Sequence, residues 1–243
     1  MKKKKLEKQV SVSNLEVIPE HIGFIVDGNR RWARQYRFPT NYGHQRGYEK
    51  VKRVIEWCLK KGVRVLSFFI FSTENWQRSK KEVAHLMGLI KRLFQEDLQY
   101  LMDQGVKLSI SGWLDDPQLD PQIRKIAIIA QEKTKNNQKG IVNLAFNYGG
   151  RPEIMHAFKK MIKDKIKASQ INEGLIERYL WTQQLPDPDL VVRTSERRLS
   201  GFLLWQSAYA ELCFLDKYWP SIKEKDIDQI LADYSRRKRR FGK

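Results

Sequence analysis

The chain has very little cysteine, because Cys58 and Cys213 are the only two cysteines among its 243 residues. Both lie in apolar stretches and lack the short spacings of a metal-binding motif, so we interpret them as reduced core residues. Long apolar runs are also missing, since the longest one, Val65–Phe71, is far shorter than a membrane span. These shortages exclude a disulfide-stapled domain, and they favour a cytoplasmic protein with at most peripheral contact to a membrane.

Acidic residues are scarce beside basic ones. The chain has 46 lysines and arginines against 28 aspartates and glutamates, which gives a formal net charge of +18. So basic a protein favours polyanionic partners, namely nucleic acid, an anionic membrane surface or phosphorylated small molecules. Composition alone leaves these three classes open.

The apolar content of 41% is enough for a proper core, and 243 residues suit one α/β domain. Residues 1–18 are polar and basic, with a cluster at Lys2–Lys5, and no apolar stretch follows them as it would in a secretory signal peptide. We therefore predict a flexible basic segment over residues 1–18 and a single folded domain over residues 19–243.

Short apolar runs alternate along the chain with segments of helical period. This alternation predicts a single α/β domain with a mostly parallel central sheet of about six strands, flanked by helices on both faces. The predicted strands are residues 21–28, 64–72, 106–112, 140–147, 189–195 and 210–216, and the predicted helices are residues 43–61, 79–104, 121–136, 152–167, 172–182 and 223–238.

Polar segments follow several of these strands. Ligands of open α/β sheets gather beyond the carboxyl ends of the strands, so the segments are expected to converge on one crevice. They are Asp27–Arg31, Ser72–Trp76, Asn147–Arg151 and Arg193–Arg198.

The first of these segments, within "IVDGNRRWAR", has a chemistry typical of a diphosphate site. From Gly28 to Tyr48 the chain carries five arginines and no acid. Arginine forks match phosphate oxygens, and Gly28 lets backbone N–H groups approach a phosphate. The single carboxylate of Asp27 is a suitable ligand for a Mg²⁺ ion that is bound to the diphosphate. The alternatives are a helix N-cap for Asp27 and a solvated face for the arginines.

Nucleic acid is the competing ligand, because aromatic residues lie among these arginines at Trp32, Tyr36, Phe38 and Tyr42. The sequence has no helix-turn-helix, zinc-finger, RRM or KH signature. Glycine and aspartate at the ends of buried parallel strands are typical of small-molecule sites. We therefore expect no nucleic-acid partner.

Six motifs in one order give the chain a resemblance to a known family, the cis-prenyltransferases or undecaprenyl diphosphate synthases. The resemblance runs from about residue 19 to the end of the chain. The motifs are "HIGFIVDGNRRWA", "GH" at residues 43–44, "FSTENWQR", "NYGGR", "RTSERRLSGFLLWQSAYAEL" and "RRFG".

The resemblance implies a catalytic domain over residues 19–243 that forms a homodimer, with an apolar tunnel beside the parallel sheet. It implies Mg²⁺-dependent condensation of isopentenyl diphosphate, in cis, onto an allylic diphosphate such as farnesyl diphosphate, with release of diphosphate and formation of a polyprenyl diphosphate. In such a reaction, Mg²⁺ and arginine stabilise the negative charge on the departing diphosphate. The nucleophile is only an alkene, so the enzyme has to position it accurately. The Asp-rich pairs of trans-type synthases are missing, since Asp115-Asp116 has no partner pair.

The resemblance also implies roles for individual residues. Asp27 and Asn75 correspond to catalytic residues, and Asp27 and Glu211 to metal-side carboxylates, with Glu211 shared at the dimer interface. Residues Arg240–Gly242 correspond to a tail that reaches the partner's site. The implied substrate-binding residues are Gly28, Asn29, Arg30, Arg31, Trp32, His44, Ser72, Thr73, Glu74, Trp76, Arg78, Arg193, Arg198 and Ser200.

The chain departs from the family pattern at four places. Arg30 replaces a usual glycine, Thr40 replaces a frequent arginine, and the loop 193–200 is one residue short, so that Arg197 is an alternative to Arg198. Ile70 stands where a small residue is common, which predicts a product no longer than the undecaprenyl chain. A shorter-chain synthase and a non-catalytic subunit of a heteromeric synthase are the alternative functions.

Overall fold

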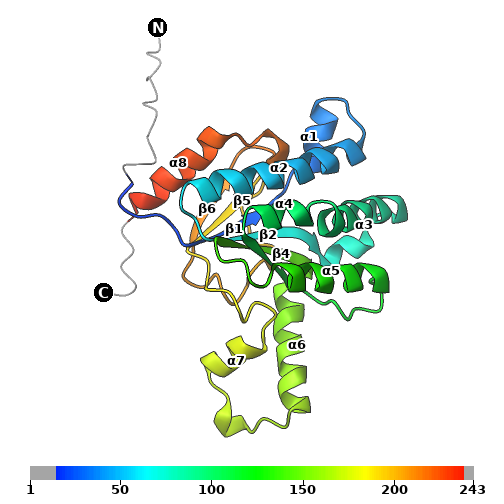
Figure 1. Ribbon diagram of the computed structural model, residues 1–243, viewed down its shortest axis with the longest axis vertical. Coiled ribbons are helices and arrows are strands. Elements are labelled where there is room, and N and C mark those ends of the chain that lie inside the picture. The colour runs from blue at the N-terminus through cyan, green and yellow to red at the C-terminus, as the bar shows by residue number, and fades with distance from the viewer. Residues whose placement is uncertain (1–14, 238–243) are drawn as a thin grey trace.

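The computed structural model describes residues 15–237. These residues form a fold built around one central sheet (Figure 1). The strand order is β3-β4-β2-β1-β5-β6, and every neighbouring pair is parallel. This confirms the predicted α/β fold with six parallel strands. The strands are β1 (His21–Ile25), β2 (Val65–Ser72), β3 (Val106–Ser111), β4 (Gly140–Tyr148), β5 (Leu190–Thr194) and β6 (Glu211–Leu215). The predicted basic cluster Lys2–Lys5 and the tail Arg240–Gly242 lie outside the described residues.

The predicted helices appear in the predicted order with different ends, and the structure adds α1 and the separate α4. The helices are α1 (Asn29–Gln35), α2 (Thr40–Lys60), α3 (Lys80–Gln95), α4 (Leu98–Asp103), α5 (Pro121–Thr134), α6 (Gly150–Lys163), α7 (Glu173–Tyr179) and α8 (Glu224–Ser235). Short 3₁₀ turns are η2 (Thr73–Gln77), η3 (Ala168–Gln170) and η4 (Trp219–Ser221).

Two helix predictions were wrong. The single helix predicted over residues 79–104 is two helices, α3 and α4, with a break at residues 96–97. The apolar period runs across this break because Phe94 and Leu98 are buried on either side of it, so the pattern could not reveal it. Helix α1 was not predicted, because its arginine-rich turns bury only Ala33 and carry no apolar stripe.

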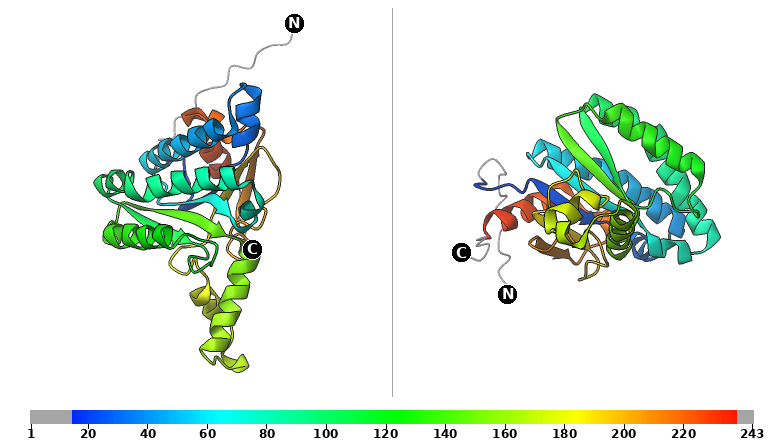
Figure 2. Two further views of the ribbon diagram at one scale, coloured as in Figure 1. Left: turned by 90° about the vertical axis from the view of Figure 1, so that its right-hand side faces the viewer. Right: turned by 90° about the horizontal axis from the view of Figure 1, so that it is seen from below.

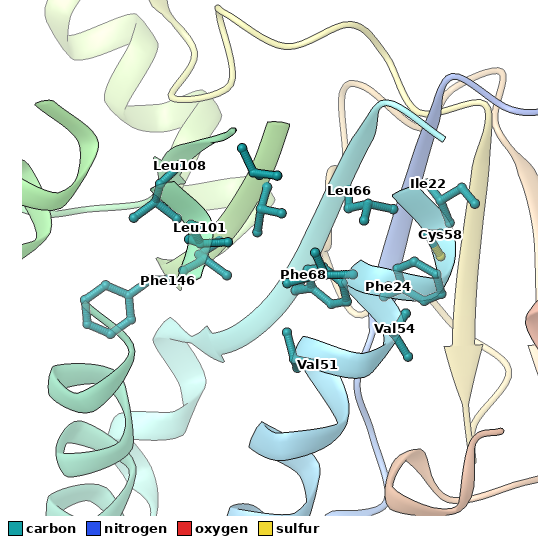
Figure 3. Packing of buried hydrophobic residues seen from close by; sticks show 14 of the residues in the cluster. Ile22, Phe24, Val51, Val54, Cys58, Leu66, Phe68, Leu101, Leu108 and Phe146 are labelled. Atoms are coloured by element: carbon teal, nitrogen blue, oxygen red, sulfur yellow. The ribbon is translucent and has the colours of Figure 1, made fainter. Parts of the chain in front are cut away.

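The main core lies between the sheet and helix α2, which presents Val51, Val54 and Cys58 toward the strands (Figure 3). Phe24 of β1 and Phe68 of β2 stack with ring centroids 5.2 Å apart under this helix. Burial raises the pKa of the Cys58 thiol far above its ordinary value. Cys58 and Cys213 are both free, as predicted, and Cys58 is fully buried.

A smaller apolar cluster covers the opposite face of the sheet. It packs Phe202 and Leu203, from the segment between β5 and β6, against strand residues such as Val191 and Ala145. Helix α6 starts beside this segment and projects away from the body of the molecule (Figures 1 and 2). The amide of Gly150, the first residue of α6, donates to the Gly201 carbonyl oxygen at 2.9 Å, which fixes this junction.

Candidate active site

A cavity of about 990 Å³ opens at the carboxyl ends of the central strands, where the sequence predicted a crevice. Its mouth is polar and rich in arginine, and its interior is apolar. The polar lining is Asp27, Asn29, Arg30, Arg31, Arg34, His44, Ser72, Glu74, Asn75, Arg78, Arg151, Arg193, Glu196, Arg198 and Ser200, together with Gly28, Gly149, Gly150 and Gly201. The apolar lining is Ile25, Val26, Val51, Phe69, Ile70, Leu86, Leu89, Ile90, Leu93, Pro152 and Leu204, with Gly47 and Tyr48.

Asp27 lies at the centre of the mouth, held between two arginines. Its Oδ2 oxygen accepts hydrogen bonds from Arg31 Nη2 at 3.2 Å and from Arg193 Nη2 at 3.0 Å. Its Oδ1 oxygen accepts from the backbone N–H of Gly28 at 2.6 Å. The Asp27 side chain is still 33% exposed, so one side of the carboxylate faces the cavity. It is not a side-chain cap of α1, because Gly28 is the N-cap residue.

Gly28 is required by both backbone conformation and space. Its φ is +98°, in the left-handed region that glycine adopts readily. A Cβ atom there would lie 2.3 Å from the Ser195 hydroxyl oxygen and 2.7 Å from the Tyr218 ring. The turn therefore places the start of α1, with its unbonded N–H groups, directly at the arginine-rich mouth.

Arg193 is a buried cation at the end of β5. Its Nη1 donates to the Ser200 hydroxyl at 2.8 Å and to the Arg198 carbonyl oxygen, so it shapes the loop that carries both residues. Its Nε atom is buried and has no hydrogen-bond partner among the described residues. Arg193 lines the cavity and pairs with Asp27, so a guanidinium and a carboxylate meet at the mouth.

The conformation of the loop after β5 places Arg197 and Arg198 in different surroundings. Arg198 lines the cavity and pairs with Glu196 at 2.9 Å, whereas Arg197 points to Asp216 and is not part of the lining. Ser195 and Ser200 have φ values of +73° and +51°, which are strained for residues with a side chain. Such strain accumulates at functional sites, where the surrounding structure has to hold it.

A second polar cluster on the α2–α3 side is centred on Glu82. Its Oε1 lies 3.0 Å from His44 Nε2 and 3.1 Å from Arg78 Nη1, and its Oε2 lies 3.8 Å from Arg30 Nη1. Burial lowers the pKa of His44 below its ordinary value despite the hydrogen bond to Glu82. Burial acts to raise the pKa of Glu82, but the His44 hydrogen bond and the Arg78 charge together lower it. Glu82 thus stays ionised and orients three predicted substrate-binding side chains.

Two side-chain hydrogen bonds hold the Ser72–Trp76 loop in place. The Asn75 Oδ1 oxygen accepts from the Ser72 N–H at 3.1 Å, and Trp76 Nε1 donates to Asn147 Oδ1 at 2.9 Å. Asn75 and Ser72 line the cavity, while Trp76 packs edge-on against Phe71 outside the lining.

Most of the predicted site residues therefore converge on one cavity, and four do not line it. Trp32 of α1 packs with Tyr36, Phe38 and Tyr42, and Thr73 and Trp76 belong to the Ser72–Trp76 loop without lining the cavity. Glu211 is the first residue of β6 and pairs with Arg237 at 2.7 Å, apart from the residues that line the cavity.

Arg34, Glu82, Arg151 and Glu196 line or support the mouth but received no individual role from the sequence, although Arg151 and Glu196 lie in segments that were predicted to gather there and Arg34 lies close beyond one of them. Glu196 pairs with both Arg31 and Arg198, and Glu82 with His44 and Arg78. Arg34 and Arg151 stood inside or beside quoted motifs, so the arginine density itself was a usable indication. Glu82 had no indication of this kind, because an acidic residue in a helix is usually solvated.

The apolar half of the cavity lies between α2 and α3, beneath β2. Ile70 lines it, whereas its neighbour Phe69 borders the cavity from the other face of the sheet, where its ring stacks on Phe202 with centroids 5.0 Å apart. The two side chains alternate between the faces of the sheet, and the β2–β4 register shifts between Phe69 and Phe71 and leaves Ile70 without a paired residue. Both residues border the cavity because it lies at the end of the strand and is lined from both faces of the sheet.

The mouth can hold a Mg²⁺ ion in the way that phosphate-binding enzymes do. Among residues 15–237 no three His, Cys, Asp or Glu side chains gather into a metal cage. One carboxylate together with substrate phosphate oxygens is a common ligand set for Mg²⁺. Asp27, partly exposed among arginines that attract a diphosphate, fits this ligand set.

Fold and site together define an α/β protein with an arginine-rich mouth at the end of a parallel sheet, suited to a phosphorylated group, and an adjoining apolar cavity. Residues 25–242 match the undecaprenyl diphosphate synthase family, and the chain belongs to this family. It is a prenyltransferase of the class that performs cis-prenyl chain elongation, as the motifs predicted.

Three relatives illustrate the match. The chain is 43% identical to an isoprenyl transferase from Bacillus cereus over 93% of this chain and 88% of that protein. It is 42% identical to a tritrans,polycis-undecaprenyl-diphosphate synthase (geranylgeranyl-diphosphate specific) from Thermoplasma volcanium, over 93% and 89% of the two chains. The crystal structure of lavandulyl diphosphate synthase from Lavandula x intermedia in complex with dimethylallyl diphosphate superposes with a TM-score of 0.88 at 32% identity, covering 94% of this chain and all of that one.

Helices within residues 15–237 are all too short or too polar to span a membrane.

Proposed function

We propose that this cavity condenses isopentenyl diphosphate onto an allylic diphosphate in a Mg²⁺-dependent reaction and extends the chain by one cis isoprenyl unit in each cycle. The observation that carries the proposal is that one cavity joins the Asp27–arginine mouth to an apolar interior. A diphosphate head and a hydrocarbon tail need this combination. The Lavandula relative, which was crystallised with an allylic diphosphate, supports it.

Arg31, the start of α1 and the Asp27-bound Mg²⁺ would hold the allylic diphosphate. Arg31 Nη1 donates to Glu196 at 2.6 Å in the structure, so the guanidinium already faces the mouth. When the allylic C–O bond breaks, the electron pair leaves with the diphosphate, and the arginines stabilise that charge. Mg²⁺ supplies Lewis-acid stabilisation of the same leaving group.

Arg193, Arg198 and Ser200 would hold the second substrate, isopentenyl diphosphate, on the other side of Asp27. Arg193 donates to both Asp27 and Ser200, so the two diphosphate positions share this central network. The alkene can then be held close to the allylic carbon, where correct placement replaces a strong nucleophile. The alkene's electron pair forms the new C–C bond, and a proton passes from the isopentenyl unit to the departed diphosphate as the C=C bond is restored. Asn75 lines the same cavity.

The experiment that tests this function is incorporation of labelled isopentenyl diphosphate by the purified chain alone, with farnesyl diphosphate as the starter. Incorporation that requires Mg²⁺ is the expected result. No incorporation without an added partner protein would favour the alternative of a non-catalytic subunit. Against that alternative, Asp27, Asn75 and Arg193 all line the cavity.

A homodimer is part of the proposal, and helix α6 offers a surface for it. Met155, Phe158 and Ile162 share one face of this projecting helix and are 53%, 45% and 76% exposed. An exposed apolar stripe on a self-complementary surface is typical of a two-fold interface. Glu211 lies on edge strand β6 beside the exposed Leu212, and we propose that it acts as a metal-side carboxylate only across such an interface.

Replacing two residues of the α6 stripe should therefore dissociate the dimer. We expect wild-type protein to sediment at twice the mass of the chain, and Phe158→Glu/Ile162→Glu to sediment as a monomer, because buried charges oppose association. The matched control is Ile128→Glu/Ile129→Glu, which changes two exposed isoleucines on α5 and should remain dimeric. A monomeric wild type, or a dimeric α6 variant, would contradict this assignment.

Peripheral attachment to anionic membranes is expected from the net charge of +18 and a product that has to enter lipid. Each basic residue near such a surface contributes about 1 kcal/mol at most, and salt screens the attraction. We therefore expect the protein to co-sediment with vesicles that contain an anionic lipid at low salt and to be released at high salt. Equal co-sedimentation with neutral vesicles would contradict an electrostatic attachment.

A further inference from the structure

A second, much smaller cavity continues the apolar one away from the diphosphate mouth. The two cavities share three lining residues, Tyr48, Val51 and Leu93. The second has a volume of only about 20 Å³, close to the space of a single water molecule. A growing hydrocarbon chain can pass beyond Leu93 only if the wall of this second cavity moves.

That wall contains one ion pair in an otherwise uncharged lining. Lys52 of α2 and Asp97, at the break between α3 and α4, are the only charged residues that line the second cavity within the described part of the chain. Lys52 Nζ donates to Asp97 Oδ1. The remaining lining is aliphatic or aromatic, with Ile55, Leu101 and Leu108 among it.

The pair is incompletely satisfied, although the Asp97 side chain is only 14% exposed and that of Lys52 is 38% exposed. Asp97 Oδ2 is buried and has no hydrogen-bond partner in the described structure, and the same holds for the Tyr48 hydroxyl. Burial raises the pKa of Asp97 to about 6 and lowers that of Lys52. The Tyr48 ring lies 5.4 Å from Lys52 Nζ, so all three side chains form one polar cap on the apolar cavity.

We propose that the Lys52–Asp97 pair is a gate at the far end of the product cavity and determines how far the prenyl chain can extend. This proposal rests on the proposed function, since the chain that reaches the gate is its product. The pair ties α2 to the α3–α4 break, the place where the wall has no continuous helix. Opening the gate separates Lys52 from Asp97 and gives the hydrocarbon a path between the two helices.

Opening the gate permanently should lengthen the product. In Asp97→Ala and Lys52→Met we expect the product distribution, read by mass spectrometry, to shift upward by about one isoprenyl unit or more, because the obstructing wall can yield. The rate of the first condensation should stay close to that of the wild type, since the gate lies beyond the reacting carbons. Asp97 is the N-cap residue of α4 but its side chain makes no capping hydrogen bond, so its loss leaves the helix cap intact.

Two further variants keep the test decisive. Asp97→Asn preserves the shape and removes the charge, so it should also lengthen the product if the alanine variant does not fold. Lys91→Ala removes the Lys91–Asp120 pair, which ties α3 to α5 away from both cavities, and should leave the lengths unchanged.

Unchanged or shorter products from the folded Lys52 and Asp97 variants would overturn the gate, and so would equal lengthening in Lys91→Ala. If the wild type makes no elongated product from isopentenyl and farnesyl diphosphates, the proposed function has failed. Normal elongation with unchanged lengths contradicts only the gate.

Discussion

Asp27→Ala is expected to lower turnover by more than about a hundredfold, the scale on which a missing charge partner in the transition state acts. The structure also indicates that this substitution should affect turnover much more than substrate binding. Arg31 and Arg193 both donate to the Asp27 carboxylate, so its removal leaves their forks free for the diphosphate. We therefore expect the KM for the allylic diphosphate to change much less than kcat. Steady-state kinetics at saturating Mg²⁺ measures both.

The matched control for Asp27 is Asp216→Ala. Asp216 also pairs with an arginine of the loop after β5, but both side chains are exposed and neither lines the cavity. This variant should keep its activity within about twofold, as surface ion pairs contribute little. If Asp27→Ala folds normally and retains more than about a third of wild-type turnover, the Asp27 carboxylate does not stabilise the transition state.

The second large effect is expected from Ile70→Ala, which should lengthen the product. Ile70 lines the apolar half of the cavity, and intruding methylene groups cost roughly 1–3 kcal/mol in a packed wall. Removing them lets elongation continue further before the product is released. The first condensation should be altered far less than the product length. Product lengths from the two proteins, compared by mass spectrometry at equal substrate ratios, test this.

Ile141→Ala is the control for this prediction. Ile141 is a partly buried isoleucine of the neighbouring strand β4, and it does not line the cavity. It should lose comparable stability without any change in product length. Identical lengths from Ile70→Ala and wild type would show that the isoleucine does not limit the chain.

Much of the fold was predictable because it depends on local patterns. Buried strands at β1, β2 and β4 are continuous apolar runs, and they alternate with amphipathic helices such as α2, so a parallel sheet follows from the sequence. Asp27 and Gly28 were also recognisable, because they directly follow a buried strand. The α3–α4 break was not predictable, since burial continues across it and no proline or glycine marks it.

The sequence by itself determined the sheet, the strand ends at which polar residues gather, and the family. Only the tertiary structure decided which of those residues share a cavity. It placed Arg198 at the mouth and Arg197 outside, through the strained turn at Ser195 and Ser200. It also brought Glu82 to His44, and Asp97 to Lys52, across 38 and 45 positions of the chain. Such pairings depend on how two helices pack against one sheet, and no local pattern of residues encodes that distance.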